Sequence, residues 1–364
     1  MANPQRAMAT VRRIDSVDPI EGADRIEVAR VGGWSVVVGK GEYKAGDYAI
    51  YFEIDTFLPI DDERFAFLAP RGTKMMVWNG EEHEGHVLRT AKMRGVYSQG
   101  LLMSPELWGI SQDVLPKLCE EHINLSKQLG VWEWYKPLPS SDFIGKYDPY
   151  VAPRTDAVRI QNIDKATWDV VKKTSYFCSV KVDGTSTTML WDERVNGFRG
   201  FSHNNEFDLT TGLGKVLYEC ADRQGILKFC EDNPMLTVQA ELCGPKIQSN
   251  RYALGSHRLF VFSLWDAVDA VYLDPYVFKE LSESVTPVLY DLDLDQFDEP
   301  ADFLAWVDGM RGNITKDRLD EGVVVHVIGN RVAKQPDWIG LVDELGPQRQ
   351  VKAVSNKYLL KAKE

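Results

Sequence analysis

The segment Lys181-Val-Asp-Gly-Thr-Ser186 stands near the middle of the chain, between two runs of β-prone residues. Asp183-Gly184 is a common tight-turn pair, so the segment alone is equally typical of a plain hairpin that carries a surface lysine. Three later stretches make it informative, because each places a charged residue on or beside a strand-like run. They are Gln239-Ala-Glu-Leu-Cys-Gly with Glu241, Asp320-Glu-Gly-Val-Val-Val with Glu321, and Gln350-Val-Lys-Ala-Val with Lys352.

These residues bring together a lysine amine, three carboxylates and a second amine. A lysine attacks phosphorus only when it is neutral, and its unperturbed pKa is about 10.4. Partial burial and nearby cations, here Lys352 and a bound metal, would lower the pKa of Lys181. Mg²⁺ and lysine would also neutralise the charge that develops on the phosphate. We therefore predict that Lys181 attacks the α-phosphate of a nucleotide and captures AMP.

The three carboxylates are candidates for holding the metal. Mg²⁺ keeps most of its waters and is bound by few carboxylates, so Asp183, Glu241 and Glu321 would orient metal-bound water. The alternative for Glu241 is an acid on the surface of an edge strand. Both glutamates lie at the ends of apolar strands, however, where an idle charge is unfavourable.

A flat apolar slot for a base is expected in Arg258-Leu-Phe-Val-Phe-Ser-Leu-Trp. Phe260 and Phe262 share one face if this run is a regular strand, and either ring would stack on adenine. The alternative is that both rings belong to the core.

The first part of the chain reads as short strands separated by turns, which predicts a small β-barrel. A hairpin is expected around Gly32-Gly33, a strand over Gly95–Met103, and a helical piece from Pro105 to Leu129. The segment 136–156 holds four prolines and is predicted to be a linker between a domain at 1–135 and a domain at 157–364. The second domain alternates helices (163–174, 213–230, 276–284, 300–311) with strands (176–182, 187–191, 236–241, 258–264, 322–327), which indicates a mixed α+β fold.

The bulk properties exclude several classes of protein. The start of the chain is not a secretion signal, and no apolar run is long enough to span a bilayer. Five scattered cysteines are typical of reduced packing residues, so we expect a cytoplasmic or other intracellular reducing compartment. The net charge of -12 argues against nucleic-acid binding driven by overall charge, although local basic clusters remain.

The order of these motifs resembles the covalent nucleotidyltransferases, which comprise ATP-dependent DNA ligases, RNA ligases and mRNA capping enzymes. Within them the chain resembles family 5 RNA ligases, which carry an OB barrel before the catalytic domain. The residues that carry this narrower resemblance lie in Ile20–Glu27, Trp34–Val38, Ala91–Leu101, Arg154–Asn162 and Gly244–Asn250. The resemblance implies an N-terminal OB-fold β-barrel followed by a mixed α/β nucleotidyltransferase (ATP-grasp-like) domain.

The resemblance also implies an activity. ATP would be the co-substrate, and Mg²⁺ or Mn²⁺ would be the metal. RNA with 3′-OH and 5′-phosphate ends, such as those of a nicked duplex, would be the partner in RNA repair. We also expect the protein to be a monomer. Lys181 would be the nucleophile, with Lys352 on the α-phosphate. By the same resemblance, Asp183, Glu241 and Glu321 would hold the hydrated metal, Glu241 alternatively contacting the ribose. Gly184, Phe262 as the adenine stacker, and Arg154 would complete the nucleotide site.

Four features depart from the family pattern. His203 replaces an arginine, Gln350 replaces the first lysine of a K-x-K motif, and Val180 replaces an acid that reads the adenine amino group. The stretch 330–349 resembles an insertion. Two alternatives stay open: a capping enzyme that uses GTP, although its OB domain would follow the catalytic domain, and a noncatalytic RNA- or tRNA-binding OB protein.

Overall fold

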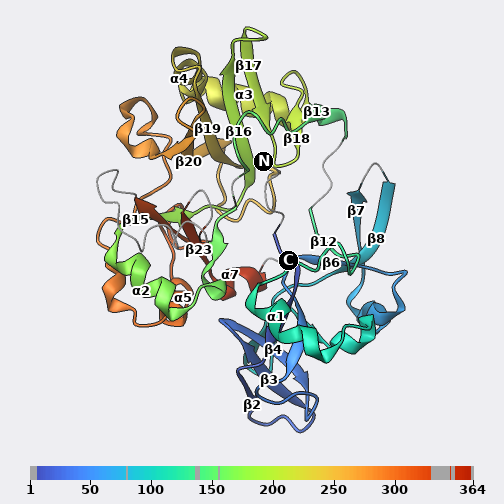
Figure 1. The fold of residues 1–364 in the computed structure, drawn as a ribbon. Helices are drawn as coiled ribbons and strands as arrows, with labels where there is room; N and C mark the ends of the chain where they lie inside the picture. The colour runs from blue at the N-terminus through green and yellow to red at the C-terminus, as the bar shows by residue number, and fades with distance from the viewer. Residues whose placement is uncertain are drawn as a thin grey trace. The chain divides into compact units, whose positions relative to one another are not determined.

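The described residues of the computed structural model, 6–78, 81–135, 140–154, 156–328, 345 and 349–361, form two compact units. One unit holds residues 6–135 and 359–361, and the other holds residues from 140 to 358 (Figure 1). Each unit has its own buried clusters of apolar side chains. In the described part of the chain, no helix combines the length and the apolar character needed to cross a membrane.

The first unit is built mainly of short antiparallel strands. They are β1 Ala9–Arg13, β2 Ser16–Pro19, β3 Ile26–Val31, β4 Trp34–Gly39, β5 Tyr48–Phe52, β6 Thr56–Pro59, β7 Lys74–Trp78, β8 Glu81–Val87, β9 Ala91–Met93, β10 Val96–Ser98, β11 Leu101–Met103 and β12 Trp132–Glu133. Their sheets have the orders β1-β5-β11, β2-β3-β4, β12-β6-β8-β7 and β10-β9. The hairpin expected at Gly32-Gly33 is confirmed, because Val31 of β3 pairs with Trp34 of β4.

Two expectations for this unit are wrong in detail. The strand expected over Gly95–Met103 is split into β10 and β11 at Gly100, which has a φ of +104° and no space for a Cβ beside the ring of Tyr51. The long helical piece is replaced by the short turns η2 Pro105–Trp108 and η3 Gln112–Val114 and the helix α1 Leu115–Glu120. Gly109, in the left-handed region, ends the first of these turns. A further 3₁₀ segment, η1, covers Glu63–Arg71.

The second unit contains two sheets. A four-stranded sheet has the order β14-β23-β22-β15, with β14 Val158–Arg159, β15 Ser175–Lys181, β22 Gly322–Ile328 and β23 Gln350–Val354. A seven-stranded sheet has the order β13-β18-β17-β16-β19-β20-β21, with β13 Phe143–Lys146, β16 Thr185–Asp192, β17 Gly197–Phe201, β18 Asn205–Phe207, β19 Leu236–Cys243, β20 Arg258–Asp266 and β21 Val271–Leu273. The expected α+β class is therefore confirmed.

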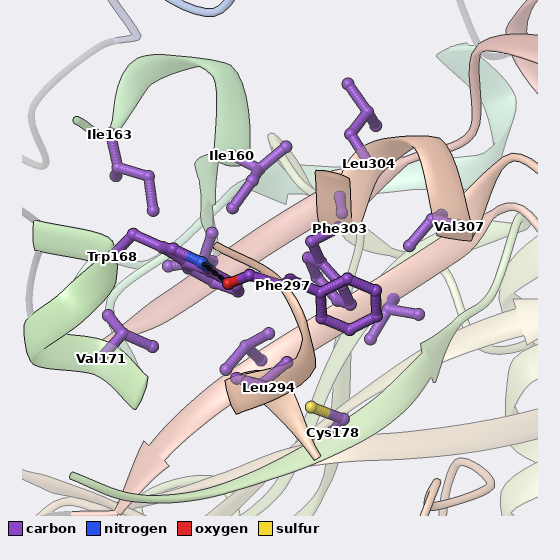
Figure 2. Close-up of a cluster of buried hydrophobic side chains, with 14 of the residues drawn as sticks. Ile160, Ile163, Trp168, Val171, Cys178, Leu294, Phe297, Phe303, Leu304 and Val307 are labelled. Atoms are coloured by element: carbon purple, nitrogen blue, oxygen red, sulfur yellow. Dashed lines mark hydrogen bonds between the residues drawn. The ribbon is translucent and has the colours of Figure 1, made fainter. Parts of the chain in front are cut away.

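One face of the four-stranded sheet is fully apolar. Val323, Val325 and Val351 pack with α2 Lys165–Lys173 and α5 Pro300–Val307 in one cluster of buried residues. Figure 2 shows this cluster, in which Trp168 donates a hydrogen bond from Nε1 to the Phe297 carbonyl oxygen at 3.1 Å. Because successive side chains of a strand point to opposite faces, the alternate residues of β15, β22 and β23 are presented on the other face. They include Ser179, Lys181, His326, Gln350 and Lys352.

The seven-stranded sheet follows the same rule. Val238, Ala240 and Leu242 of β19 are buried against a cluster that includes residues of α3 Gly212–Arg223 and α4 Ile226–Asp232. Glu241 therefore lies on the opposite face of β19. The single helix expected over 213–230 is divided into these two helices at Gly225, whose φ of +72° is incompatible with a continuous helix.

The helix expected over 276–284 is wrong. This segment contains only the 3₁₀ turns η6 Pro275–Val277 and η7 Lys279–Leu281, near the shorter 3₁₀ turn η8 Leu294–Gln296. The end of this segment pairs with strand β20 through backbone hydrogen bonds. The N–H of Val261 donates to the Ser284 carbonyl oxygen, and the N–H of Thr286 donates to the Val261 carbonyl oxygen. Further on, Ser179 of β15 forms a β-bridge with Val288. Residues 284–289 thus connect the two sheets by backbone hydrogen bonds.

The described part of the segment expected to be a linker belongs to the second unit. It contains the turn η4 Ser140–Asp142 and strand β13, which pairs with β18 at one edge of the seven-stranded sheet. Prolines tend to exclude a segment from central strands, but an edge strand tolerates them nearby.

Candidate active site

The segment Lys181–Ser186 connects the two sheets. The hairpin reading of Asp183-Gly184 is wrong, since β15 pairs with β22 in one sheet and β16 pairs with β17 and β19 in the other. Gly184 lies at the crossing, where an added Cβ would come within 2.4 Å of the Leu242 carbonyl oxygen. Only glycine fits there without displacing the backbone. The crossing therefore places the end of β15 beside the end of β19.

Lys181 is the last residue of β15 and forms an ion pair with Glu321. Its Nζ lies 2.7 Å from Glu321 Oε1. The register explains the pair, because Lys181 is opposite Gly322 and Glu321 directly precedes that glycine. A Cβ on Gly322 would come within 2.0 Å of the Ala353 carbonyl oxygen, so this glycine lets β22 and β23 approach closely.

Glu241 enters the same cluster from the seven-stranded sheet. It lies on β19, an interior strand, so the edge-strand alternative is wrong. The Gly184 N–H donates a hydrogen bond to its carboxylate. Burial raises the pKa of Glu241 to about 8; the charge of Lys181 opposes this shift, and the negative charges of Glu321 and Asp183 add to it.

Asp183 is held by residues that the sequence reasoning did not find. Tyr358 donates its hydroxyl to Asp183 Oδ2 at 2.6 Å, and the Asp183 N–H donates to the Tyr252 hydroxyl at 3.0 Å. Burial, with a contribution from the Asp183 carboxylate, raises the pKa of Tyr358 well above its usual value, so its hydroxyl keeps its proton. Neither tyrosine belongs to a motif, and only the fold brings them to the lysine segment.

Lys352 lies on the same face of the four-stranded sheet. Its Nζ lies 2.6 Å from Asp156 Oδ1, and it pairs in parallel register with Arg159 of β14. Burial raises the pKa of Glu321, and the charges of Lys181 and, more weakly, Lys352 oppose this shift. Lys352 is thus electrostatically linked to the Lys181 cluster through Glu321. Asp156 and the buried Arg159 are additional polar residues of this face.

The expectation that the pKa of Lys181 is lowered is wrong for the protein without ligands. Burial alone would lower this pKa, but Glu321 and Glu241 raise it more, so the net pKa lies above the usual value. The pKa values of Glu241 and Glu321 are raised mainly by burial; neighbouring negative charges add to these shifts, and the charge of Lys181 opposes them. The neighbouring carboxylates therefore stabilise the protonated form of Lys181.

The carboxylates fit a hydrated metal better than a directly coordinated one. Among the described residues, no three His, Cys, Asp or Glu side chains are arranged to hold one ion between them. Yet Glu321 Oε2 is buried and accepts no hydrogen bond from any described residue. Burying a carboxylate oxygen without a partner costs free energy unless a cation or an ordered water binds to that oxygen. A hydrated Mg²⁺ or Mn²⁺ would supply both.

Two further residues predicted to bind the nucleotide, Phe262 and Arg154, also lie in the second unit. Phe262 is half-buried at a β-bulge of β20, whereas Phe260 is buried opposite Glu241 in a cluster with Tyr252. The bulge adds one residue between Val261 and Ser263, so the simple alternation that placed both rings on one face does not apply. Arg154 lies over the ring of Tyr147, with its guanidinium carbon 5.4 Å from the ring centroid.

The departures from the family pattern have structural counterparts. Gln350 donates from Nε2 to His326 Nδ1 at 3.1 Å, and His326 Nε2 lies 2.8 Å from Ser179 Oγ. Gln350, which stands where the family pattern has a lysine, therefore belongs to a neutral, buried hydrogen-bond network. Burial lowers the pKa of His326 to about 3. Val180 is buried. Of the stretch 330–349, only residues 345 and 349 are among the described residues.

Replacing Glu241 with glutamine is expected to change how stability depends on pH. The folded-state pKa of about 8 exceeds the unfolded value of about 4.3, so the folded protein binds more protons between these values. Stability from this group is therefore present at low pH and is lost as pH rises through about 8. Thermal unfolding without nucleotide or metal should show a decline from pH 5 to 9 that is smaller in Glu241→Gln. Equal declines in both proteins would contradict the prediction.

Comparisons with known proteins identify two families that match parts of the chain. Residues 8–105 match the family description of an OB-fold domain, and residues 174–339 match that of RNA ligase. No curated protein sequence matches the chain. The OB-fold domain followed by a nucleotidyltransferase domain, expected from the motifs, is thereby confirmed.

Solved structures of the Naegleria gruberi RNA ligase are similar over nearly the whole chain. An apo variant has 26% identity and a TM-score of 0.77, and the match covers 98% of each chain. The ligase with PPi has 27% identity and a TM-score of 0.77, covering 98% of this chain and 99% of that one. A variant with ATP and Mn has 27% identity and a TM-score of 0.76, covering 100% and 99%.

Proposed function

The chain is an ATP-dependent RNA ligase with an N-terminal OB-fold domain, and on that premise we propose that it seals RNA strands through an AMP group carried on Lys181. The observation that carries the proposal is the ion pair of Lys181 with Glu321 at 2.7 Å, at the point where Glu241 comes from the seven-stranded sheet and Asp183 from the segment that joins the two sheets. The variants of the Naegleria ligase in the similar structures replace lysines, glutamates and an aspartate, which are the residue types of this cluster.

In the first step, Lys181 Nζ forms a bond to the α-phosphorus of ATP, and pyrophosphate leaves. Lys181 must first lose the proton that the carboxylates stabilise. A bound Mg²⁺ or Mn²⁺ would supply positive charge that opposes this hold on the proton and offsets the charge developing on phosphorus. Lys352 would stabilise the α-phosphate from the neighbouring strand β23. Asp183, Glu241 and Glu321 would orient the water shell of the metal.

The remaining steps transfer the AMP group to RNA. The 5′-phosphate of one strand attacks the lysyl-AMP, and Lys181 leaves as the amine. The 3′-OH of the other strand then attacks the 5′-phosphate and displaces AMP, which forms the phosphodiester bond. We place this reaction in RNA repair, with a nicked duplex or a pair of free ends as the substrate.

The proposal extends to the working form of the protein. All five predicted cluster residues, Lys181, Asp183, Glu241, Glu321 and Lys352, come from one chain, which supports a monomer. All five cysteines are free. Free thiols persist in reducing surroundings, which supports an intracellular site of action.

Sealing of defined nicks tests the proposed function. Duplexes with a single nick, carrying RNA or DNA on either side and a 5′-phosphate or 5′-OH at the break, are incubated with ATP and Mg²⁺ or Mn²⁺. We expect sealing at 5′-phosphate nicks that have an RNA 3′-OH, with adenylated RNA as an intermediate. Nicks with a 5′-OH are the matched control and should remain open. Activity with GTP in place of ATP would favour a capping enzyme, and RNA binding without any sealing would favour a noncatalytic OB protein.

A further inference from the structure

Among the described residues, Tyr358 is the one tyrosine whose hydroxyl donates to a carboxylate of the Lys181 cluster. It lies on α7 Asn356–Lys361, six residues after Lys352, and its side chain is 4% exposed. The hydroxyl donates to Asp183 Oδ2 at 2.6 Å, a charge-assisted hydrogen bond. Asp183 itself stands two residues after Lys181 in the segment that joins the two sheets.

Several independent contacts fix Tyr358 in this position. Arg251 donates from Nη1 to the Tyr358 carbonyl oxygen at 2.8 Å, and its guanidinium carbon lies 4.2 Å from the centroid of the tyrosine ring. The Tyr358 N–H donates to Ser355 Oγ at 3.2 Å. The Ser355 N–H in turn donates to the Glu321 carbonyl oxygen at 2.8 Å. The segment that follows Lys352 is therefore bound both to Glu321 and to Asp183.

The hydrogen bond also determines which carboxylate oxygen of Asp183 remains available. Oδ2 accepts from Tyr358, while the Asp183 N–H is bound by Tyr252 and the Asp183 carbonyl oxygen accepts from Cys243 Sγ at 3.4 Å. None of the described residues donates to Oδ1. With its backbone and one oxygen fixed, the carboxylate has a single orientation, in which Oδ1 is the oxygen left for another ligand.

We propose that Tyr358 is a positioning residue for lysine adenylation: its hydroxyl fixes the Asp183 carboxylate so that Oδ1 faces the water shell of the metal. The inference rests on the proposed function. Groups that orient metal-binding carboxylates from outside the ligand set are expected to affect metal affinity or activity by about 10- to 100-fold. Tyr358 would act through Asp183, without touching ATP.

Tyr358→Phe tests the proposal, because it removes the hydroxyl and keeps the ring that packs on Arg251. Two quantities are measured. The first is the Mn²⁺ dissociation constant of the protein bound to α,β-methylene-ATP, which cannot lose pyrophosphate, from electron paramagnetic resonance of free Mn²⁺ with the analogue alone as blank. The second is the Mn²⁺ dependence of lysyl-AMP formation. We expect both the dissociation constant and the half-saturating Mn²⁺ concentration to rise about tenfold or more, with the KM for ATP at saturating Mn²⁺ nearly unchanged.

Tyr51→Phe is the matched control. The Tyr51 hydroxyl is also buried and donates to a carbonyl oxygen, that of Gln99 at 3.0 Å, in the first unit, whereas the Lys181 cluster belongs to the second. This variant should lose a similar amount of thermal stability and keep the wild-type Mn²⁺ dependence. Wild-type Mn²⁺ values in Tyr358→Phe, or equal shifts in both variants, would overturn the inference.

A double variant distinguishes a positioning role of Tyr358 from a general loss of structure. In Asp183→Ala, the Tyr358 hydroxyl has lost its partner, so adding Tyr358→Phe should weaken Mn²⁺ binding no further. An additional loss of the same size as in the wild type would show that Tyr358 acts by another route. The proposed function fails if the wild-type protein acquires no AMP on Lys181. The positioning role alone fails if the wild-type protein acquires AMP on Lys181 and Tyr358→Phe has the same Mn²⁺ dependence as the wild type.

Discussion

Lys181→Met protein is expected to form no lysyl-AMP, with a fall in adenylation on the order of 10⁴-fold or more, because no other group replaces a removed nucleophile. Sealing from ATP should be lost to the same extent. RNA that already carries a 5′-adenylate should still be joined, since its final step uses the 3′-OH and not the lysine. Adenylation is measured with α-labelled ATP, and joining is measured on a nick made with adenylated RNA.

Lys181→Arg is the control for charge. The Lys181 cation balances Glu321, Glu241 and Asp183, so its removal leaves buried carboxylates without their partner. Arginine keeps the positive charge and has no neutral form available for attack. We expect Lys181→Arg to melt closer to the wild type than Lys181→Met and to be equally inactive in adenylation. Substantial labelling of either variant would contradict the assignment of Lys181 as nucleophile.

Gly184→Ala is expected to reduce lysyl-AMP formation by about 100-fold or more. The new Cβ would lie 2.4 Å from the Leu242 carbonyl oxygen and 2.6 Å from Cys243 Sγ, so the backbone has to move. That movement displaces the Gly184 N–H from the Glu241 carboxylate and shifts Asp183 next to it. Misplacement of a reacting group by about 1 Å costs on the order of 10²-fold in rate. Single-turnover labelling with ATP measures the effect.

Gly255→Ala is the matched control for Gly184→Ala. A Cβ at Gly255 meets no atom within 4 Å, so the same substitution is expected to leave labelling and melting temperature near those of the wild type. A Gly184→Ala protein that labels as fast as Gly255→Ala would show that the crossing between the two sheets tolerates movement. It would then not be the element that positions Asp183 and Glu241.

The apolar pattern predicted much of the second unit. The strands around Lys181, Glu241 and Glu321 were expected within a few residues of where they lie, because the core on one side of each sheet imposes a regular alternation. The placement of β15 and β16 in different sheets was not predictable from Asp183-Gly184. Turn propensity is local, whereas the separation of these strands into two sheets depends on β22 and β19, which are distant in the sequence.

Other parts of the site were beyond sequence reasoning for similar reasons. Tyr358, Tyr252 and Asp156 belong to no motif, and their contacts with Asp183 and Lys352 arise only from the fold. The direction of the Lys181 pKa depends on a sum of charges from separate segments. The sequence identifies the carboxylates, but only their distances show that they outweigh burial in the protein without ligands.

Peptide mass mapping of freshly adenylated wild-type protein tests the central claim most directly. The protein is incubated with ATP and Mg²⁺ without RNA, and it is digested at a pH that preserves phosphoramidates. We predict one peptide with the added mass of a single AMP group, attached to Lys181 and released by acid. Complete absence of this adduct, or its attachment to another side chain such as Lys352, would contradict the account.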